Sequence, residues 1–292
     1  MDITAQMVKE LRDRTGAGMM DCKKALKECN GDIDSAIDMM RKAGQAKADK
    51  KSSRVAAEGV IDFLADKEKN NACLVEVNCE TDFVAKDENF LNFVSKVSSL
   101  SLSNFTGNID EFVNQKINDG KSLEELRLEL VSKVGENVQI RRIKVIEGNN
   151  GHIGSYLHGK KIGVVICLSD KNENLAKDIA MHIAAMKPIA IQEKDISKDI
   201  IDKERDIYLA QASESGKPKE IIEKMVDGKL KKFLNEVTLL SQQFVKDPDT
   251  SIGALLEKSN CEVLDFFRYE VGEGIDKKEE NFAEEVMSQI KN

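Results

Sequence analysis

The chain has 292 residues, of which 33% are charged and 41% hydrophobic, a composition typical of a globular protein with about two domains. Its net charge of -8 and its lack of tryptophan argue against a phosphate-binding surface and against base-stacking platforms, so no nucleic-acid partner is expected. No apolar run approaches the ~20 residues that span a bilayer, and no secretory signal is visible, so a cytoplasmic protein without membrane contact is predicted.

Residues 1–54 predict three short helices followed by a linker. Thr4 is placed to cap the first helix and Asp32 the third, whose expected stop is Gly44. Residues 45–54 are polar and basic without an apolar face, which is typical of a linker or of a solvated helix extension.

Two methionines, Met19 and Met20, follow the glycine-rich turn between the first two helices. The methionine side chain adapts to irregular surfaces, so the pair suits a docking site for a partner. Filling the core of the helical unit is the more frequent use of such a pair.

Residues 55–150 change to a mixed pattern of strands and helices. Strands are expected at 55–64, 72–77 and 138–147, and helices at 88–100 and 122–134. Residues 78–84 lie where the second of these strands passes into the first helix, and binding residues are often carried on such connections. The plainer interpretation is that Phe83 and Val84 enter a hydrophobic core.

Residues 151–190 repeat this order of hairpin, acidic connection and helix. Strands are expected at 154–158 and 162–168, and a helix at 175–185. The segments Asp87-Glu88-Asn89-Phe90 and Asn172-Glu173-Asn174-Leu175 introduce the two helices alike. We therefore predict an α+β protein whose core has two related subdomains, each an antiparallel sheet with helices on one face.

Residues 191–239 lose the strand signal and predict an antiparallel helical hairpin, broken at Ser215-Gly216-Lys217-Pro218. Two helices alone bury little surface. The hairpin is therefore expected to dock on its own domain, on a second copy of the chain or on a partner.

Residues 240–276 return to the sheet domain, with a helix at 251–260 and a strand at 263–271. Residues 277–292 predict a charged amphipathic helix. Its apolar side carries Phe282, Val286 and Ile290.

The chain contains no catalytic constellation. Residues 154–161 imitate part of a phosphate-binding loop, but Lys161 replaces the magnesium-binding Ser or Thr, and a strand follows where a helix is required. Six scattered cysteines and three histidines suggest no metal site, and no cofactor is expected. These absences favour a binding or regulatory protein over an enzyme.

Two long segments closely resemble the signatures of the bacterial elongation factor Ts family. They are residues 11–26, with Thr15-Gly16-Ala17-Gly18-Met19-Met20-Asp21-Cys22, and residues 76–84, with Thr81-Asp82-Phe83-Val84. The likeness also covers Gly154-Ser155-Tyr156 with His158-Gly159, Ser215-Gly216-Lys217-Pro218 and residues 267–274.

This resemblance implies a definite architecture. It consists of a three-helix module of ubiquitin-associated (UBA-like) type with its linker, a two-subdomain core, a protruding coiled-coil hairpin and a C-terminal helical module. The matching residues are 1–54 for the N-terminal module, 55–150 for the N-subdomain, 151–190 and 240–276 for the C-subdomain, 191–239 for the hairpin and 277–292 for the C-terminal module.

The resemblance also implies a guanine-nucleotide exchange factor that binds elongation factor Tu, GDP-bound or nucleotide-free, during translation elongation. In the family, an Asp-Phe pair wedges into the nucleotide-binding domain of that partner and disturbs its magnesium site; Asp82 and Phe83 match the pair and are expected at an exposed tip. The other partner contacts implied are Thr81, Val84, His158, Arg12, Met19, Met20, Phe282 and Val286. The hairpin would contact a later domain of the partner or support a homodimer.

One departure from common family sequences is Glu80, where Gln is frequent, so the charge beside the wedge differs. Two other function classes remain open from the residues alone. One is an interaction scaffold that binds ubiquitin-like or helical ligands through the N-terminal module. The other is a nucleotide-dependent enzyme that uses residues 154–161.

Overall fold

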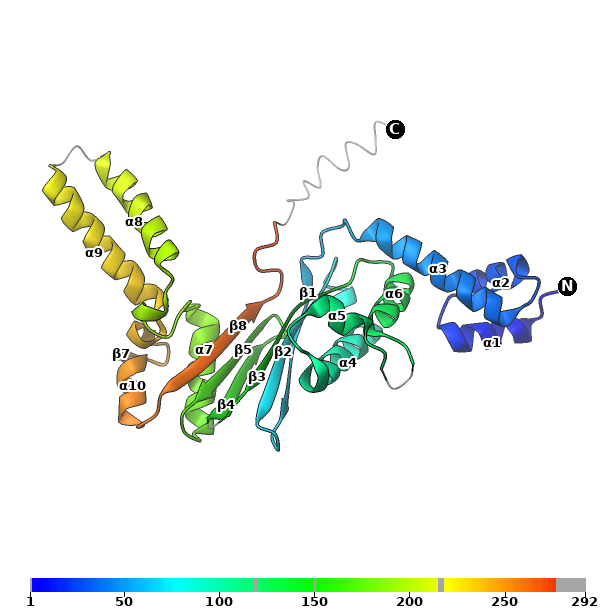
Figure 1. Ribbon diagram of the computed structural model, residues 1–292, viewed down its shortest axis with the longest axis horizontal. Coiled ribbons are helices and arrows are strands. Elements are labelled where there is room, and N and C mark those ends of the chain that lie inside the picture. Colours follow the sequence, from blue (N-terminus) through cyan, green and yellow to red (C-terminus); the bar gives the residue numbers. More distant parts are fainter. Residues whose placement is uncertain (1, 118–119, 150, 215–217, 277–292) are drawn as a thin grey trace. The chain divides into compact units, whose positions relative to one another are not determined.

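The structure is a computed structural model that describes residues 2–117, 120–149, 151–214 and 218–276 (Figure 1). Its contacts divide the chain into two compact units. Of the described residues, the first unit contains those within 2–62, 75–144 and 270–276, and the second contains those within 63–74 and 145–269. Helices and small sheets occur in both units, which confirms the predicted α+β class.

Three helices begin the first unit: α1 (Ala5–Thr15), α2 (Met19–Glu28) and α3 (Ile33–Lys51). The predicted cap is present, because Thr4 Oγ1 accepts the Met7 N–H at 3.2 Å. The three helices share a small core of their own, formed by Leu11, Cys22, Ala25, Leu26 and Ala36.

The prediction that the third helix stops at Gly44 is wrong. Helix α3 continues to Lys51, so the polar residues after Gly44 form the solvated helix extension that was the alternative to a linker. A glycine inside a helix costs only about 1 kcal/mol relative to alanine. The alanines and lysines that follow are good helix formers, and Ala48 is buried, which offsets that cost.

The sheet of the N-terminal half has the order β1-β2-β3, with β2 in the centre. Its strands are β1 (Glu58–Asp66), β2 (Asn71–Cys79) and β3 (Gln139–Glu147). Three helices lie on one side of it (Figure 1): α4 (Glu88–Asn104), α5 (Ile109–Asn114) and α6 (Leu123–Val134). The short α5 lies between the two predicted helices, where no element was predicted. Helix α6 begins with a capping box between Ser122 and Glu125.

The second sheet has the order β4-β5-β8, formed by β4 (His152–His158), β5 (Ile162–Leu168) and β8 (Val263–Glu270). Helix α7 (Glu173–Met186) covers β4 and β5 and supplies much of their core. The order of hairpin followed by helix therefore occurs twice, as predicted. The two helices also begin alike, because the side chains of Asp87 and Asn172 each accept a backbone N–H of the first turn.

The second unit also contains α8 (Lys198–Ser213), α9 (Lys219–Val237), β6 (Gln243–Phe244), β7 (Asp247–Ser251) and α10 (Ile252–Lys258). Helices α8 and α9 lie along each other (Figure 1) and are linked by an ion pair of 3.1 Å between Arg205 and Asp227. The small β6-β7 ribbon was not predicted.

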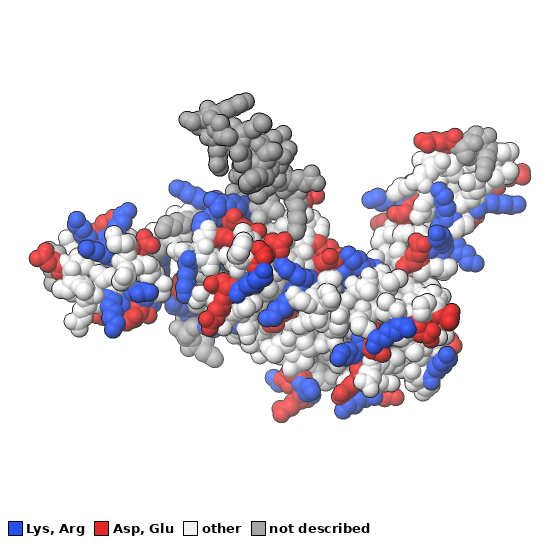
Figure 2. Space-filling model, turned by 180° about the vertical axis from the view of Figure 1, so that it is seen from behind, with Lys and Arg blue, Asp and Glu red and all other residues white. Residues whose placement is uncertain are grey.

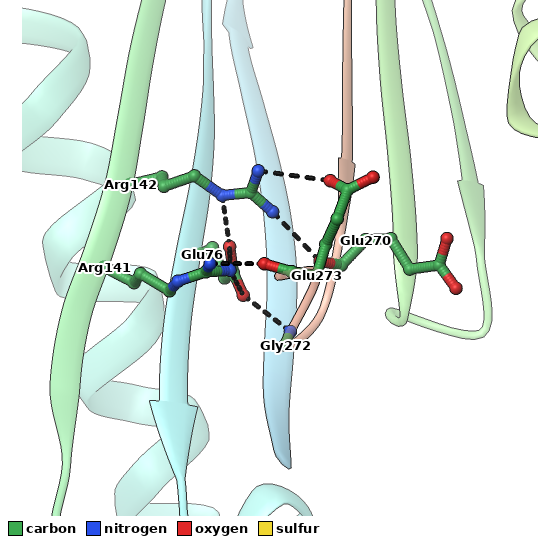
Figure 3. A network of polar contacts seen from close by, with 6 residues as sticks. All are labelled: Glu76, Arg141, Arg142, Glu270, Gly272 and Glu273. Carbon is green, nitrogen blue, oxygen red and sulfur yellow. Dashed lines mark hydrogen bonds and ion pairs between the residues drawn. The ribbon is translucent and has the colours of Figure 1, made fainter. Parts of the chain in front are cut away.

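A buried carboxylate holds together three distant segments of the first unit (Figure 3). Glu76 of β2 is fully buried and pairs with Arg141 at 3.1 Å and with Arg142 at 2.5 Å, both on β3. The Gly272 N–H, from the turn after β8, donates to Glu76 Oε1 at 2.9 Å. The two guanidinium groups also reach the backbone carbonyls of Glu270 and Glu273.

Gly272 is required at that place for two reasons. Its φ of +72° lies in the left-handed region that side chains rarely adopt. A Cβ there would also lie 2.3 Å from the carbonyl oxygen of Ala57. The close backbone approach is what lets the Gly272 N–H enter the buried site of Glu76.

The core of the second unit contains a buried histidine, His182 of α7. Its Nδ1 accepts the Val245 N–H at 3.2 Å, so its Nε2 carries the proton and donates to Gln242 Oε1 at 2.9 Å. The Gln242 amide nitrogen donates to two backbone carbonyls, which fixes its oxygen toward the ring. Burial lowers the pKa of His182 below its ordinary 6.5, although the bond to Gln242 opposes this shift.

The protein is expected to lose stability in mildly acidic solution because of His182. The unfolded chain binds a proton that the folded chain disfavours, so the free energy of unfolding falls as the pH drops below about 6.5, by at most about 1.4 kcal/mol per pH unit. Urea denaturation at pH 7.5, 6.5 and 5.5 measures this slope. The variant His182→Gln should have a lower stability at pH 7.5 and a flatter slope. Equal slopes in the two proteins would contradict the assignment.

Candidate functional site

The chain makes a compact turn between β2 and α4, and the predicted wedge residues lie on it. After β2 ends at Cys79, the backbone passes into a short 3-10 helix, Val84–Lys86. Successive N–H groups bond back along the turn, from Ala85 to the Thr81 carbonyl and from Lys86 to the Phe83 carbonyl. The backbone carbonyls of Thr81 and Phe83 thus have partners within the turn.

Phe83 projects from this turn with 81% of its surface exposed. The interpretation that it enters the protein's own core is wrong, and the expected exposed tip is present. The neighbouring Val84 is half-buried, and Ala85 is the residue that anchors the turn to the core. An isolated exposed phenylalanine is costly to hydrate and releases about 1.5–3 kcal/mol when a partner buries it.

Asp82 is exposed beside Phe83, and its carboxylate pairs with Lys86 Nζ at 2.7 Å. The side chain that caps the turn is that of Thr81, whose Oγ1 accepts the Val84 N–H at 3.3 Å. The charge of Asp82 is therefore directed outward, toward solvent and Lys86.

An open hollow lies next to the phenylalanine ring, lined by Phe83, Val84, Asp87, Asn89, Lys133 and Val134. Its polar wall is ordered, because Lys133 Nζ donates to Asn89 Oδ1 at 2.6 Å. The Asn89 side-chain amide donates to Asp87 Oδ1 and thereby lowers the pKa of that carboxyl below its ordinary 3.8. Asp87 is therefore ionised at neutral pH, which also suits its place at the start of α4.

Three further candidates lie on the N-terminal helices. Met19 and Met20, in the first turn of α2, are 62% and 78% exposed, so the core-filling interpretation of the pair is wrong. Arg12, on α1, is also exposed. These side chains are free of the small core that α1, α2 and α3 share, which leaves them available to a partner.

His158 ends β4 in the second unit, and its side chain is exposed. Its Nδ1 lies 3.2 Å from the hydroxyl of Tyr156, two residues earlier on the same strand. The two rings are tilted neighbours, with centroids 6.2 Å apart. Phe282 and Val286 lie outside the described residues.

The segment 154–161 is a β-hairpin between β4 and β5 and has no phosphate-loop geometry. Gly159 and Lys160 both have positive φ, as a tight hairpin turn requires. Gly154 serves helix packing, because a Cβ there would lie 2.4 Å from the Cβ of Ala176 on α7. The hypothesis of a nucleotide-dependent enzyme therefore has no support from residues 154–161.

Two residues that support the turn were not predicted. Glu136, in the connection between α6 and β3, accepts a hydrogen bond from the Thr81 hydroxyl at 2.7 Å. The next residue, Asn137, is buried, and its backbone N–H donates to Glu80 Oε1 at 2.6 Å. The predicted helix at 122–134 and strand at 138–147 leave this segment as a connection, but no local pattern indicated that it would bind residues 80 and 81.

No group of three or more His, Cys, Asp or Glu side chains among the described residues is arranged to hold a metal ion. All six cysteines are free thiols. Over the same part of the chain, every helix is too short or too polar to cross a bilayer.

Known proteins resemble this chain along its whole length. The sequence profile of the family described as "Elongation factor TS" matches residues 80–273. The chain is 56% identical over 292 residues to elongation factor Ts of Thioalkalivibrio sulfidiphilus, with 100% of this chain and 99% of that protein covered. It is 53% identical over 289 residues to elongation factor Ts of Legionella pneumophila strain Paris, with 99% of both proteins covered. The elongation factor Ts of Ruthia magnifica is likewise 53% identical over 290 residues, covering 99% of this chain and 98% of that protein.

Proposed function

The chain belongs to the elongation factor Ts family, and from this premise we propose that it binds elongation factor Tu with GDP bound and accelerates GDP release. The observation that carries the proposal is the exposure of Phe83, 81% free on a turn whose backbone is held in place. The chain does not catalyse a chemical reaction in this role. It changes the affinity of its partner for a nucleotide.

The mechanism that we propose is a wedge. Asp82 and Phe83 enter the nucleotide-binding domain of the partner, with Thr81 and Val84 at the base of the wedge, and disturb the magnesium site. The Asp82 carboxylate is already paired with Lys86 in the free chain. On binding, either this ion pair breaks or Lys86 enters the partner together with Asp82.

Thermodynamic linkage requires that a factor that binds the nucleotide-free partner better must weaken nucleotide binding by the same ratio. Weakening GDP binding ~100-fold takes about 2.7 kcal/mol. Burial of one phenylalanine side chain releases ~1.5–3 kcal/mol. Phe83 is therefore of the right size to supply much of the coupling.

The remaining contacts are assigned by the same proposal. Arg12, Met19 and Met20 belong to the UBA-like N-terminal module and contact the same domain of the partner, as do His158 and, from the C-terminal module, Phe282 and Val286. The hairpin of α8 and α9 contacts a later domain of the partner or joins two copies of the chain. The hairpin carries four apolar side chains that are each more than a third exposed: Ile200, Ile207, Leu209 and Ile221.

The charge distribution supports a protein partner over nucleic acid. On the face shown in Figure 2, acidic and basic side chains are interspersed, whereas a phosphate backbone is bound by clustered positive charge. We propose a cytoplasmic protein that works without a cofactor, in keeping with the described free thiols.

A release assay tests the function directly. Elongation factor Tu is loaded with a fluorescent GDP analogue and mixed with excess unlabelled GDP, with increasing amounts of the chain. We expect release to accelerate and then saturate as the chain is added. Equilibrium dialysis of the chain alone against GDP or ATP should show no binding. Binding to elongation factor Tu without faster release would favour the scaffold function instead.

A further inference from the structure

We propose that Glu136 is the positioning residue for Phe83, an inference that rests on the proposed function. Its carboxylate holds the backbone just before the wedge. Glu136 Oε2 accepts the N–H groups of Glu80 and Thr81, at 3.1 and 2.9 Å, while its Oε1 accepts the Thr81 hydroxyl at 2.7 Å. Three donors thus converge on one side chain from a segment 55 residues away.

The N–H groups of Glu80 and Thr81 come directly after the end of strand β2. Strand β2 ends at Cys79, so the next two peptides have left the strand. An unpaired peptide N–H in a half-buried place is unfavourable, and the Glu136 side chain supplies an acceptor for both of these groups. Glu136 therefore defines where the chain leaves the sheet and enters the turn.

The support is reciprocal. Glu80 Oε1 accepts the Asn137 N–H at 2.6 Å, so neighbouring residues of each segment receive the N–H groups of the other. Asn137 is buried, and its side-chain amide donates to the Arg54 carbonyl at 2.8 Å. Each segment thus donates backbone hydrogen bonds to a carboxylate of the other. These bonds hold residues 80–81 against residues 136–137, and the Asn137 side chain holds both against the chain that follows α3.

Phe83 depends on this support because its own side chain packs so little. With 81% of its surface exposed, the ring takes its position from the backbone that carries it. A wedge that is already in its bound geometry avoids the cost of ordering at the moment of binding. Glu136 thereby influences binding by setting the position of Phe83, and it makes no contact with the partner itself.

The reach of the side chain should matter more than its charge. In Glu136→Gln, the amide oxygen can accept both N–H groups while its nitrogen donates to Thr81 Oγ1, so near wild-type exchange is expected. Glu136→Asp keeps the charge but is one methylene shorter, which withdraws its oxygens from the N–H groups. We expect Glu136→Asp and Glu136→Ala to lower the maximal rate of GDP release about ten-fold, the factor that corresponds to roughly 1.4 kcal/mol of lost hydrogen bonding.

Glu80 should tolerate the replacement that removes its charge. In Glu80→Gln the side-chain oxygen still accepts the Asn137 N–H, and only the 3.5 Å pair with Arg54 is lost, in which the arginine side chain is 55% exposed and that of Glu80 is 20% exposed. A long pair that is open to solvent on the arginine side contributes little. Release within two-fold of wild type is expected for this variant, whereas a loss as large as that of Glu136→Ala would show that charge, not geometry, governs the turn.

A double-mutant cycle separates positioning from a general loss of structure. GDP release from elongation factor Tu is measured at saturating concentrations of wild type, Glu136→Ala, Phe83→Ala and the double variant. If Glu136 acts through Phe83, its replacement costs about ten-fold in wild type and close to nothing in the Phe83→Ala background. Equal losses in both backgrounds would overturn the proposal. Glu111→Ala, an exposed carboxylate on α5, is the matched control and should release GDP at the wild-type rate.

Amide hydrogen exchange on the chain alone tests the same idea without the partner. Glu136→Ala and Glu136→Asp should lose protection at the amides of Glu80 and Thr81 while the melting temperature changes little; unchanged protection would refute the positioning role. If Glu136→Ala does not fold, Glu136→Asp and Glu136→Gln carry the comparison. If wild type itself fails to accelerate GDP release, the proposed function fails, while the exchange result still decides whether Glu136 holds the turn.

Discussion

The variant Phe83→Ala is expected to reduce the acceleration of GDP release by about ten- to hundred-fold, the factor that corresponds to the ~1.5–3 kcal/mol released when a phenylalanine side chain is buried. The side chain is 81% exposed, so its removal leaves almost no cavity in the protein itself. The melting temperature should therefore stay close to that of wild type. Stopped-flow release of a fluorescent GDP analogue from elongation factor Tu gives the rate.

Two companion variants make this result specific. Phe83→Leu keeps an apolar side chain on the turn and should retain part of the acceleration. Leu264→Ala removes an exposed apolar residue of β8, which is not part of the turn, and should leave the rate unchanged. Release by Phe83→Ala at the wild-type rate would refute the wedge.

The second large effect is expected at Glu76. The variant Glu76→Ala removes the buried counter-charge shared by Arg141 and Arg142, of which Arg142 keeps its pair with Glu273, and it leaves the Gly272 N–H without this acceptor. Breaking a buried ion pair from one side costs about 3–5 kcal/mol. Both arginine side chains keep about a quarter of their surface in solvent, so the lower end of that range is expected. Urea denaturation followed by circular dichroism measures the loss.

The matched control for Glu76 lies in the same network. Glu273 pairs with Arg142 at 3.2 Å, but 45% of its side chain is exposed. Exposed pairs contribute about 0–1 kcal/mol, so Glu273→Ala should be several times milder than Glu76→Ala. A Glu76→Ala variant as stable as Glu273→Ala would mean that the arginines find other partners or water.

Much of the fold could be predicted because its signals are local. Thr4 begins α1, Ser122 begins α6, and the spacing of apolar residues in α4 appears in the structure as its buried face. Where local signals conflict, the prediction failed. Gly44 is typical of a helix C-terminus. Helix α3 nevertheless continues to Lys51, because Ala48 is buried and the residues around it are good helix formers.

The candidate site was predictable only in part. Phe83 was identified through the family resemblance, and its exposure could not be derived from hydrophobicity, which favours burial. The support of the turn was missed entirely. Glu136 and Thr81 are 55 residues apart, and their bond exists only because the sheet and α6 bring two connections together. The same holds for Glu76, whose role depends on arginines 65 residues later.

The network around Glu76 also makes the first unit depend on a late part of the chain. Gly272 donates to Glu76 across 196 residues, so the bond cannot form during synthesis until the turn after β8 has been made. Most of the second unit lies between these two residues in the sequence and is synthesised before the bond can close. The buried carboxylate of Glu76 therefore receives its last donor only near the end of synthesis.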